Sequence, residues 1–207
     1  MRAFIYTGGK VYPEFVTDHP RGDDLVIAAD SGYDNAKKLG EKPALLIGDF
    51  DSMKSGFPDG PEIIRLKPEK DYTDTQAAVE EAIARGADDI IIIGGLGGRV
   101  DHSMSNMAIL ENLRLRGIHA FLTDGLSKAR FIRNSSELIG RSGYRYLSII
   151  AADEKVKGVS AEGVKYPLKN ATLLRSNQYA VSNEIDGNCA LISVKKGGIW
   201  IIESRDA

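Results

Sequence analysis

Two carboxylates stand where a buried strand should end. In "LLIGDFDSM", residues 45–53, an apolar run is followed by Asp49 and Asp51. Their mutual repulsion has to be offset by water or by a cation, and carboxylates at this spacing can both turn toward one hard cation such as Mg²⁺. The alternative is that each is a solvated turn residue, which is the commoner role of a single aspartate in a loop.

A second acidic pair lies in "PEKDYTDTQAAVEEAI", at the start of a helix-like segment. Asp71 and Asp74 are three residues apart, so they lie near one face if both belong to the helix. Alternatively, Asp71 or Thr73 caps the helix and Asp74 is an acid favoured by the helix dipole. An acidic helix start close to an acidic strand end is unfavourable without a metal, so the two pairs together predict a metal site. Lys67 and Lys70 can contact phosphate, or both are solvated surface lysines.

A glycine-rich turn follows four consecutive isoleucines in "IIIIGGLGGRVDHSMSN" and precedes a helix-like segment. Such a turn lets backbone N–H groups approach a phosphate closely. Arg99 can grip phosphate oxygens, and Asp101 can orient Arg99 or bind a ribose hydroxyl. His102 has a stronger structural alternative, because a histidine in a first helical turn more often caps or packs. The glycines of this turn are Gly94, Gly95, Gly97 and Gly98.

The elements that must position these residues follow two patterns. Residues 1–125 alternate strand-like runs such as "AFIYT", "LVIAA" and "DIIII" with helix-like segments, which predicts an α/β domain on a mostly parallel sheet. Residues 126–207 contain strand-length runs such as "ARFIR", "YRYLSIIAA" and "ALISVKKGGIWIIES" separated by turns, which predicts a small antiparallel β domain. Ligands of open α/β sheets bind beyond the carboxyl ends of the strands. Asp30, Asp49, Asp51 and the glycines are therefore expected on one rim.

Composition limits the class of protein. The chain has 207 residues, of which 43% are hydrophobic and 27% charged, as in ordinary globular proteins. A net charge of −2 gives no general attraction to nucleic acid or acidic membranes. The single cysteine, Cys189, excludes an intrachain disulfide, and no apolar run reaches the roughly 18 residues of a membrane span. The N-terminus has no signal-peptide pattern, so we expect a cytoplasmic protein with neither nucleic acid nor membrane as partner.

Five ordered blocks of sequence carry a family resemblance. They are "ADSGYDNAKKLG", "GDFDSM", "KDYTDTQAA", "GGLGGRVDHSMSN" and "GVKYPLKNATL", the last followed by "VSNEIDG". Together they resemble the successive blocks of thiamine pyrophosphokinases over almost the whole chain. The resemblance implies transfer of pyrophosphate from ATP to thiamine by attack at the β-phosphorus, giving thiamine diphosphate and AMP. It also implies a Rossmann-like α/β domain that binds nucleotide and Mg²⁺, followed by a thiamine-binding β-sandwich.

The resemblance also assigns roles to individual residues. It implies that Asp49, Asp51 and Asp74 bind Mg²⁺, with Asp71 in the same catalytic acidic cluster together with Arg99. It further implies a homodimer whose active sites are shared between subunits. The vitamin-stacking aromatic is left open, because Trp200 in "GGIWIIES" is as consistent with the β-domain core. The nucleotide- and substrate-binding positions are Asp30, Gly98, Asp101, His102, Ser182 and Asn183.

Two other functions are compatible with parts of the pattern. "LLIGDFDS" resembles the nucleophile motif of haloacid-dehalogenase-type phosphatases, although Met53 stands where those enzymes usually have Thr or Val. Release of phosphate from monoesters would indicate that class. A non-catalytic nucleotide-sensing module is the second alternative, and Mg²⁺-dependent nucleotide binding without turnover would indicate it.

Overall fold

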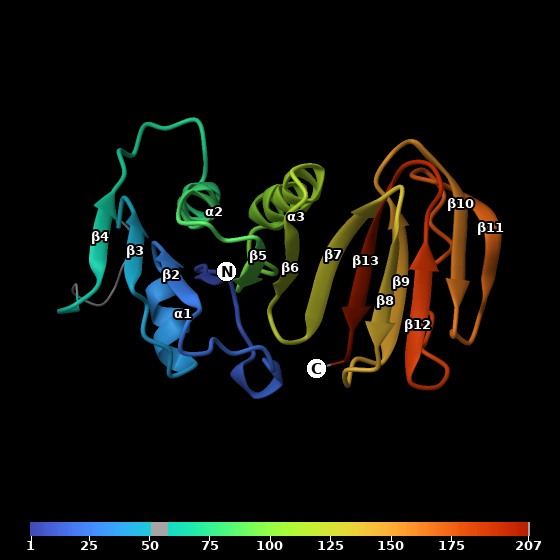
Figure 1. The fold of residues 1–207 in the computed structure, drawn as a ribbon, viewed down its shortest axis with the longest axis horizontal. Helices are drawn as coiled ribbons and strands as arrows, with labels where there is room; N and C mark the ends of the chain where they lie inside the picture. The colour runs from blue at the N-terminus through green and yellow to red at the C-terminus, as the bar shows by residue number, and fades with distance from the viewer. Residues whose placement is uncertain (51–57, 207) are drawn as a thin grey trace. The chain divides into compact units, whose positions relative to one another are not determined.

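The structure is a computed structural model, and it describes residues 1–50 and 58–206. The chain divides into two compact units, Met1–Gly125 and Leu126–Ala207, which we call unit 1 and unit 2 (Figure 1). Each has its own buried core. Within the described ranges, no helix has the length and apolar character needed to cross a membrane.

Unit 1 is built on a parallel sheet with the strand order β4-β3-β2-β1-β5-β6. The predicted apolar runs form these strands. The strands β1, β2, β3 and β5 are almost continuously apolar because they are buried on both faces, whereas the edge strand β4 is largely exposed. The strands are β1 (Arg2–Tyr6), β2 (Leu25–Ala29), β3 (Leu45–Gly48), β4 (Glu62–Arg65), β5 (Asp89–Ile93) and β6 (His119–Thr123).

Helices cover both faces of this sheet (Figure 1). They are α1 (Gly32–Lys38), α2 (Asp74–Ala84) and α3 (Val100–Leu115), and a short 3₁₀ turn, η1, spans Pro13–Phe15. The crossover from β2 to β3 runs in one direction along the sheet, whereas those from β4 to β5 and from β5 to β6 run in the other. Since such crossovers are right-handed, α1 lies on one face and α2 and α3 lie on the other.

Unit 2 contains two antiparallel groups of strands, in the orders β7-β13-β9 and β11-β10-β12-β8. Alternate side chains of the two groups form a common core that includes Ile149, Val159, Ile192 and Ile201, so the predicted antiparallel β-sandwich is confirmed. The strands are β7 (Ser127–Arg133), β8 (Ser136–Gly140), β9 (Tyr146–Ala151), β10 (Lys155–Glu162), β11 (Leu168–Leu174), β12 (Cys189–Ser193) and β13 (Gly198–Ser204).

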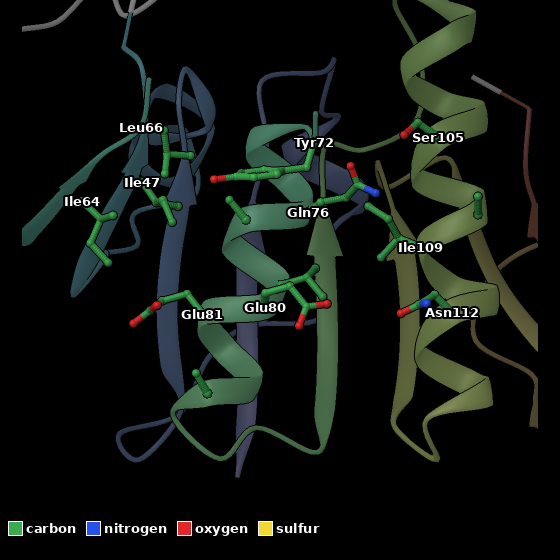
Figure 2. A pocket seen from close by; sticks show the side chains of 14 residues that line it. Ile47, Ile64, Leu66, Tyr72, Gln76, Glu80, Glu81, Ser105, Ile109 and Asn112 are labelled. Carbon is green, nitrogen blue, oxygen red and sulfur yellow. The ribbon is translucent and has the colours of Figure 1, made fainter. Parts of the chain in front are cut away.

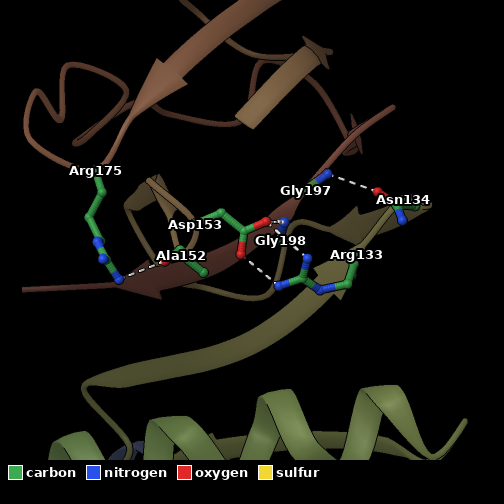
Figure 3. A network of polar contacts seen from close by, with 7 residues as sticks. All are labelled: Arg133, Asn134, Ala152, Asp153, Arg175, Gly197 and Gly198. Carbon is green, nitrogen blue, oxygen red and sulfur yellow. Dashed lines mark hydrogen bonds and ion pairs between the residues drawn. The ribbon is translucent and has the colours of Figure 1, made fainter. Parts of the chain in front are cut away.

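A polar network fixes the start of β13 (Figure 3). Asp153 accepts hydrogen bonds from Arg133 at 2.7 and 2.9 Å and from the Gly198 N–H at 3.1 Å. The Gly197 N–H donates to Asn134 Oδ1 at 2.8 Å. The Arg133 guanidinium lowers the pKa of Asp153. Strand β12 ends at Ser193 and β13 begins at Gly198, so the apolar run that the sequence pattern had joined forms two strands.

Candidate active site

A cavity of about 480 Å³ opens in unit 1 beyond the carboxyl ends of the parallel strands, and we call it the unit 1 cavity. Its walls come from residues 7–10, 29–31 and 72–75, and from the glycines and Arg99 that follow β5. Strands β1 and β5 are neighbours in the sheet. From β1 the chain continues to β2 on one side, and from β5 it continues to β6 on the other side. The cavity therefore occupies the topological switch point, where open α/β sheets bind their ligands.

Backbone approaches backbone closely at the rim of this cavity. A Cβ atom on Gly9 would lie 2.0 Å from the carbonyl oxygen of Gly94, which itself has a φ of +84°. Asn35 Nδ2 donates to the carbonyl oxygens of Thr7 and Gly9 at 2.6 and 2.7 Å. Buried Asn106 donates to the Gly95 carbonyl oxygen at 2.9 Å. The result is a fixed glycine-rich rim of the kind that admits phosphate groups.

An ammonium group joins the two acidic segments. Lys70 Nζ lies 3.0 Å from Asp49 Oδ2 and 3.2 Å from Asp74 Oδ1. The three side chains are 9%, 15% and 24% exposed, respectively. Burial raises the pKa of Asp74, Lys70 opposes that shift, and the charges of Asp49 and Asp30 reinforce it. The strand end and the helix start therefore lie close together, and within the described residues a lysine offsets the repulsion of their carboxylates.

The other predicted acids lie in different surroundings. Asp30 lines the unit 1 cavity and has a φ of +49°. Asp71 is exposed and is not part of the cavity wall. Thr73, not Asp71, caps α2, through a reciprocal capping box with Gln76. Asp51 lies outside the described residues, and among those described no group of three metal-binding side chains gathers.

Arg99 stands at the mouth of the cavity as the N-cap residue of α3. Its guanidinium is 73% exposed and makes a two-point ion pair with Asp101, with distances of 2.6 and 3.2 Å. Arg99 thereby lowers the pKa of Asp101. His102 and Gly98 also line the cavity, whereas Asp101 does not. The arrangement presents an oriented cation to an anionic ligand.

Sequence reasoning did not single out the segment 7–10, although it follows β1 directly and lines the cavity. The letters "TGGK" carried a usable signal, because two glycines and a lysine after a strand resemble the other phosphate-suited turn. Lys10 Nζ lies 4.3 Å from the centre of the Tyr12 ring, which restrains this exposed lysine near the rim. Of the two lysines considered for phosphate contact, Lys70 lines the cavity, whereas Lys67 is exposed and does not.

A second hollow, of about 770 Å³, runs beside α2 (Figure 2). Apolar side chains from β3, β4 and α3 line it, and Tyr72 belongs both to this hollow and to the unit 1 cavity. Its two glutamates already form ion pairs, Glu80 with Arg116 and Glu81 with Arg85. The hollow is larger than the unit 1 cavity but holds neither the glycine turns nor the aspartates, so we assign it no chemistry.

Ser182 and Asn183 lie in unit 2 and organise the loops around them. Ser182 has a φ of +56°, and its N–H donates to Ser148 Oγ at 3.0 Å. The Asn183 side chain accepts from the Tyr166 N–H at 3.0 Å and donates to the Tyr166 carbonyl oxygen at 2.8 Å. Asn183 thus clamps the backbone beside Tyr166, whose ring is exposed.

Trp200 does not belong to the core between the two groups of strands. Its neighbours Ile199 and Ile201 point into that core, so alternation directs Trp200 to the opposite face of β13. There it packs edge-on against Phe131, with ring centres 6.0 Å apart. The structure therefore decides against the core position that the sequence left open.

The chain is similar to proteins of one kind over nearly its whole length. Residues 20–122 match the family model "Thiamin pyrophosphokinase, catalytic domain", and residues 136–199 match "Thiamin pyrophosphokinase, vitamin B1 binding domain". Thiamine pyrophosphokinase of Bacillus subtilis is 29% identical over 210 residues, covering 98% of each chain. Thiamin pyrophosphokinase 1 of Caenorhabditis elegans is 24% identical over 176 residues, covering 81% of this chain and 72% of its own.

Solved structures agree with these matches. The crystal structure of thiamine pyrophosphokinase from Bacillus subtilis has a TM-score of 0.89 at 26% identity and covers 100% of both chains. That of thiamin pyrophosphokinase from Geobacillus thermodenitrificans has a TM-score of 0.86 at 26% identity, covering 100% of this chain and 99% of its own. The comparisons do not favour the phosphatase or the sensing module.

Proposed function

Because the chain belongs to the thiamine pyrophosphokinase family, and is therefore a kinase that transfers pyrophosphate from ATP to thiamine, we propose that ATP binds in the unit 1 cavity. The observation that carries this proposal is that a fixed glycine rim lines this cavity and that the Asp49–Lys70–Asp74 cluster reaches its wall through Lys70 and Asp74. The glycine turns would receive the phosphates, and Arg99 at the mouth would neutralise phosphate oxygens as AMP departs. Asp30, Gly98, Asp101 and His102 complete the nucleotide side.

We propose that Asp49 and Asp74, with Asp51 and supported by Asp71, hold Mg²⁺. The donor set fits, because two carboxylates already face one cationic group at 3.0 and 3.2 Å and Mg²⁺ commonly takes one or two carboxylates besides water and phosphate. When bound, the ion supplies charge neutralisation for the triphosphate. The protein's own contribution is to hold Asp49, at the end of β3, and Asp74, at the start of α2, on one ammonium group at the edge of the cavity, whose wall includes Lys70 and Asp74.

We propose that thiamine is held beside Ser182 and Asn183 in unit 2, and that the enzyme is a homodimer whose sites each combine unit 1 of one chain with unit 2 of the other. The separate family matches of the two units support a division of labour between nucleotide and vitamin binding. In a two-fold dimer such a contact occurs twice.

We also propose that the enzyme works in the cytoplasm. The reaction consumes ATP, and an exposed free thiol, that of Cys189, is compatible with a reducing compartment. Fractionation of cells that produce a tagged chain tests this location, and recovery of the enzyme outside the cytoplasmic fraction contradicts it.

The products of the reaction test the assignment directly. With ATP, Mg²⁺ and thiamine, we expect thiamine diphosphate and AMP to form in equal amounts, because attack at the β-phosphorus makes AMP the leaving group. Both products are measured by chromatography of the same reaction. Formation of ADP with thiamine monophosphate would contradict transfer of pyrophosphate as a unit.

A further inference from the structure

Lys70 is enclosed by acids at the edge of the unit 1 cavity. Its side chain is 9% exposed, and its Nζ contacts the strand-end carboxylate of Asp49 and the helix-start carboxylate of Asp74. Asp49 precedes Lys70 by 21 residues in the sequence, and Asp74 follows it by four. One flexible side chain therefore ties the end of β3 to the start of α2.

Lys70 is a positive charge placed among acidic side chains. Asp49 and Asp74 repel each other, and Asp30 is near enough to act on Asp74 as well. The ammonium of Lys70 offsets part of that repulsion, so the carboxylates can face each other before any metal is bound. A divalent cation that binds these carboxylates must compete with this ammonium, since both are attracted to the same oxygens.

The same geometry allows the ammonium of Lys70 to change partners. Lys70 lines the unit 1 cavity together with the glycine rim, and its side chain has four rotatable methylene carbons. When a metal–nucleotide complex enters, the metal weakens the pull of the carboxylates on the ammonium while the phosphates bring new negative charge. Rotation of the side chain is then enough to exchange a carboxylate partner for a phosphate partner.

Resting on the proposed nucleotide site, we propose that Lys70 is an exchanging cation: it holds Asp49 and Asp74 together in the metal-free enzyme and contacts a phosphate oxygen once the metal–nucleotide complex is bound. Lys70 therefore lowers the affinity of the free enzyme for Mg²⁺ alone and raises the affinity for MgATP. A lysine with a merely structural role has no reason to affect the two affinities in opposite directions.

The test is calorimetric titration of the full-length Lys70→Met variant, first with Mg²⁺ alone and then with MgATP without thiamine. We expect Mg²⁺ to bind about tenfold more tightly and MgATP about tenfold more weakly than in the wild type, the change given by losing one charge-assisted contact. We also expect the metal-free variant to melt at a lower temperature and to gain more from added Mg²⁺. Lys67→Met, an exposed lysine in the same segment, is the matched control and should change neither affinity.

Lys70→Arg and Lys70→Gln separate charge from packing. The arginine variant keeps the charge and should bind Mg²⁺ as weakly as the wild type, whereas the glutamine variant should behave like Lys70→Met and replaces it if that variant does not fold. Unchanged Mg²⁺ affinity in the neutral variants, or unchanged MgATP affinity, overturns the proposal. A wild-type enzyme that binds no MgATP at all instead contradicts the proposed nucleotide site, so the two failures are distinguishable.

Discussion

At the scale of single residues, Asp74 combines a structural and a chemical task. It is the first residue of α2, where a negative charge is favoured by the helix dipole, and it also faces Lys70 across the cavity edge. Burial raises the pKa of Asp74, and the ammonium of Lys70 acts in the opposite direction. Both of the roles considered for it from the sequence, dipole-favoured acid and member of an acidic cluster, are therefore compatible.

Removing the charge of this carboxylate should impair turnover far more than folding. We expect Asp74→Asn to lower kcat by about 100-fold or more, because an amide is a poorer ligand for a hard cation and a weaker partner for Lys70. Steady-state assays measure the effect, and circular dichroism checks the fold. Glu69→Gln, an exposed acid in the same segment, is the control. Equal activity of the two variants would count against a catalytic role for Asp74.

Partner choice explains why the Lys70 contacts were not predictable. The sequence indicated that the two acidic segments meet, because strand ends and helix starts share one edge in an α/β sheet. Which cation lies between them depends on a tertiary contact between Lys70 and Asp49, which are 21 residues apart in the sequence. No local pattern distinguishes Lys70 from Lys67. For the same reason the choice between Asp71 and Thr73 as helix cap needed the backbone geometry.

At the scale of elements, apolar runs predicted the strands of unit 1 well and several strands of unit 2 poorly. The strands β1 to β7 and β9 correspond to predicted apolar runs, β12 and β13 were predicted as one run, and β8, β10 and β11 were missed. Strand β10 alternates lysine with valine and is interrupted by Gly158, where the pairing with β11 shifts register. In β11 Lys169, Asn170 and Thr172 are polar and exposed, and Leu173 is the buried residue. Strand pairing, not hydrophobicity, defines such segments.

The network at the start of β13 should make unit 2 sensitive to acid. The pKa of Asp153 is lower when folded than the ordinary value of 3.8, so its ion pair with Arg133 contributes fully above that pH and is lost as the pH falls through the folded pKa. We expect Asp153→Asn to lower the free energy of unfolding by about 1–3 kcal/mol at neutral pH. When the pH falls below 3.8, the free energy of unfolding should decrease less in this variant than in the wild type.

Denaturant unfolding at pH 7 and pH 3 measures both parts of this prediction. Glu154→Gln, whose side chain is exposed beside Asp153, is the matched control and should unfold like the wild type. An Asp153→Asn variant with wild-type stability at pH 7 would show that the network orders β13 without stabilising it.

At the scale of the whole molecule, two units with separate cores carry the two halves of the proposed site. The residues proposed to bind nucleotide lie in unit 1, and Ser182 and Asn183 lie in unit 2. The boundary after Gly125 coincides with the change from alternating α/β pattern to turn-separated strands. The number of chains per active site is a property of the assembly, and it is tested by combining chains.

Complementation distinguishes a shared site from one built within a single chain. An Asp74→Asn chain and a Ser182→Ala/Asn183→Ala chain should each be nearly inactive, but unfolding them together and refolding the mixture should restore about a quarter of wild-type activity. Random pairing makes about half of the dimers mixed, and each mixed dimer has one intact site of two. Mixed dimers, isolated by two different tags, that remain inactive would contradict the shared site.

The near-contact of Gly9 with the Gly94 carbonyl oxygen has a consequence for inhibitor design. Any larger residue at position 9 meets main-chain atoms at 2.0 Å, and positive φ at position 94 disfavours other residues there. A compound whose contacts are confined to this stretch of main chain would touch atoms that every viable mutant must keep. Escape from such a compound would have to arise at adjustable side chains, such as the exposed Arg99 and His102 at the cavity mouth, where substitution would also affect the proposed nucleotide site.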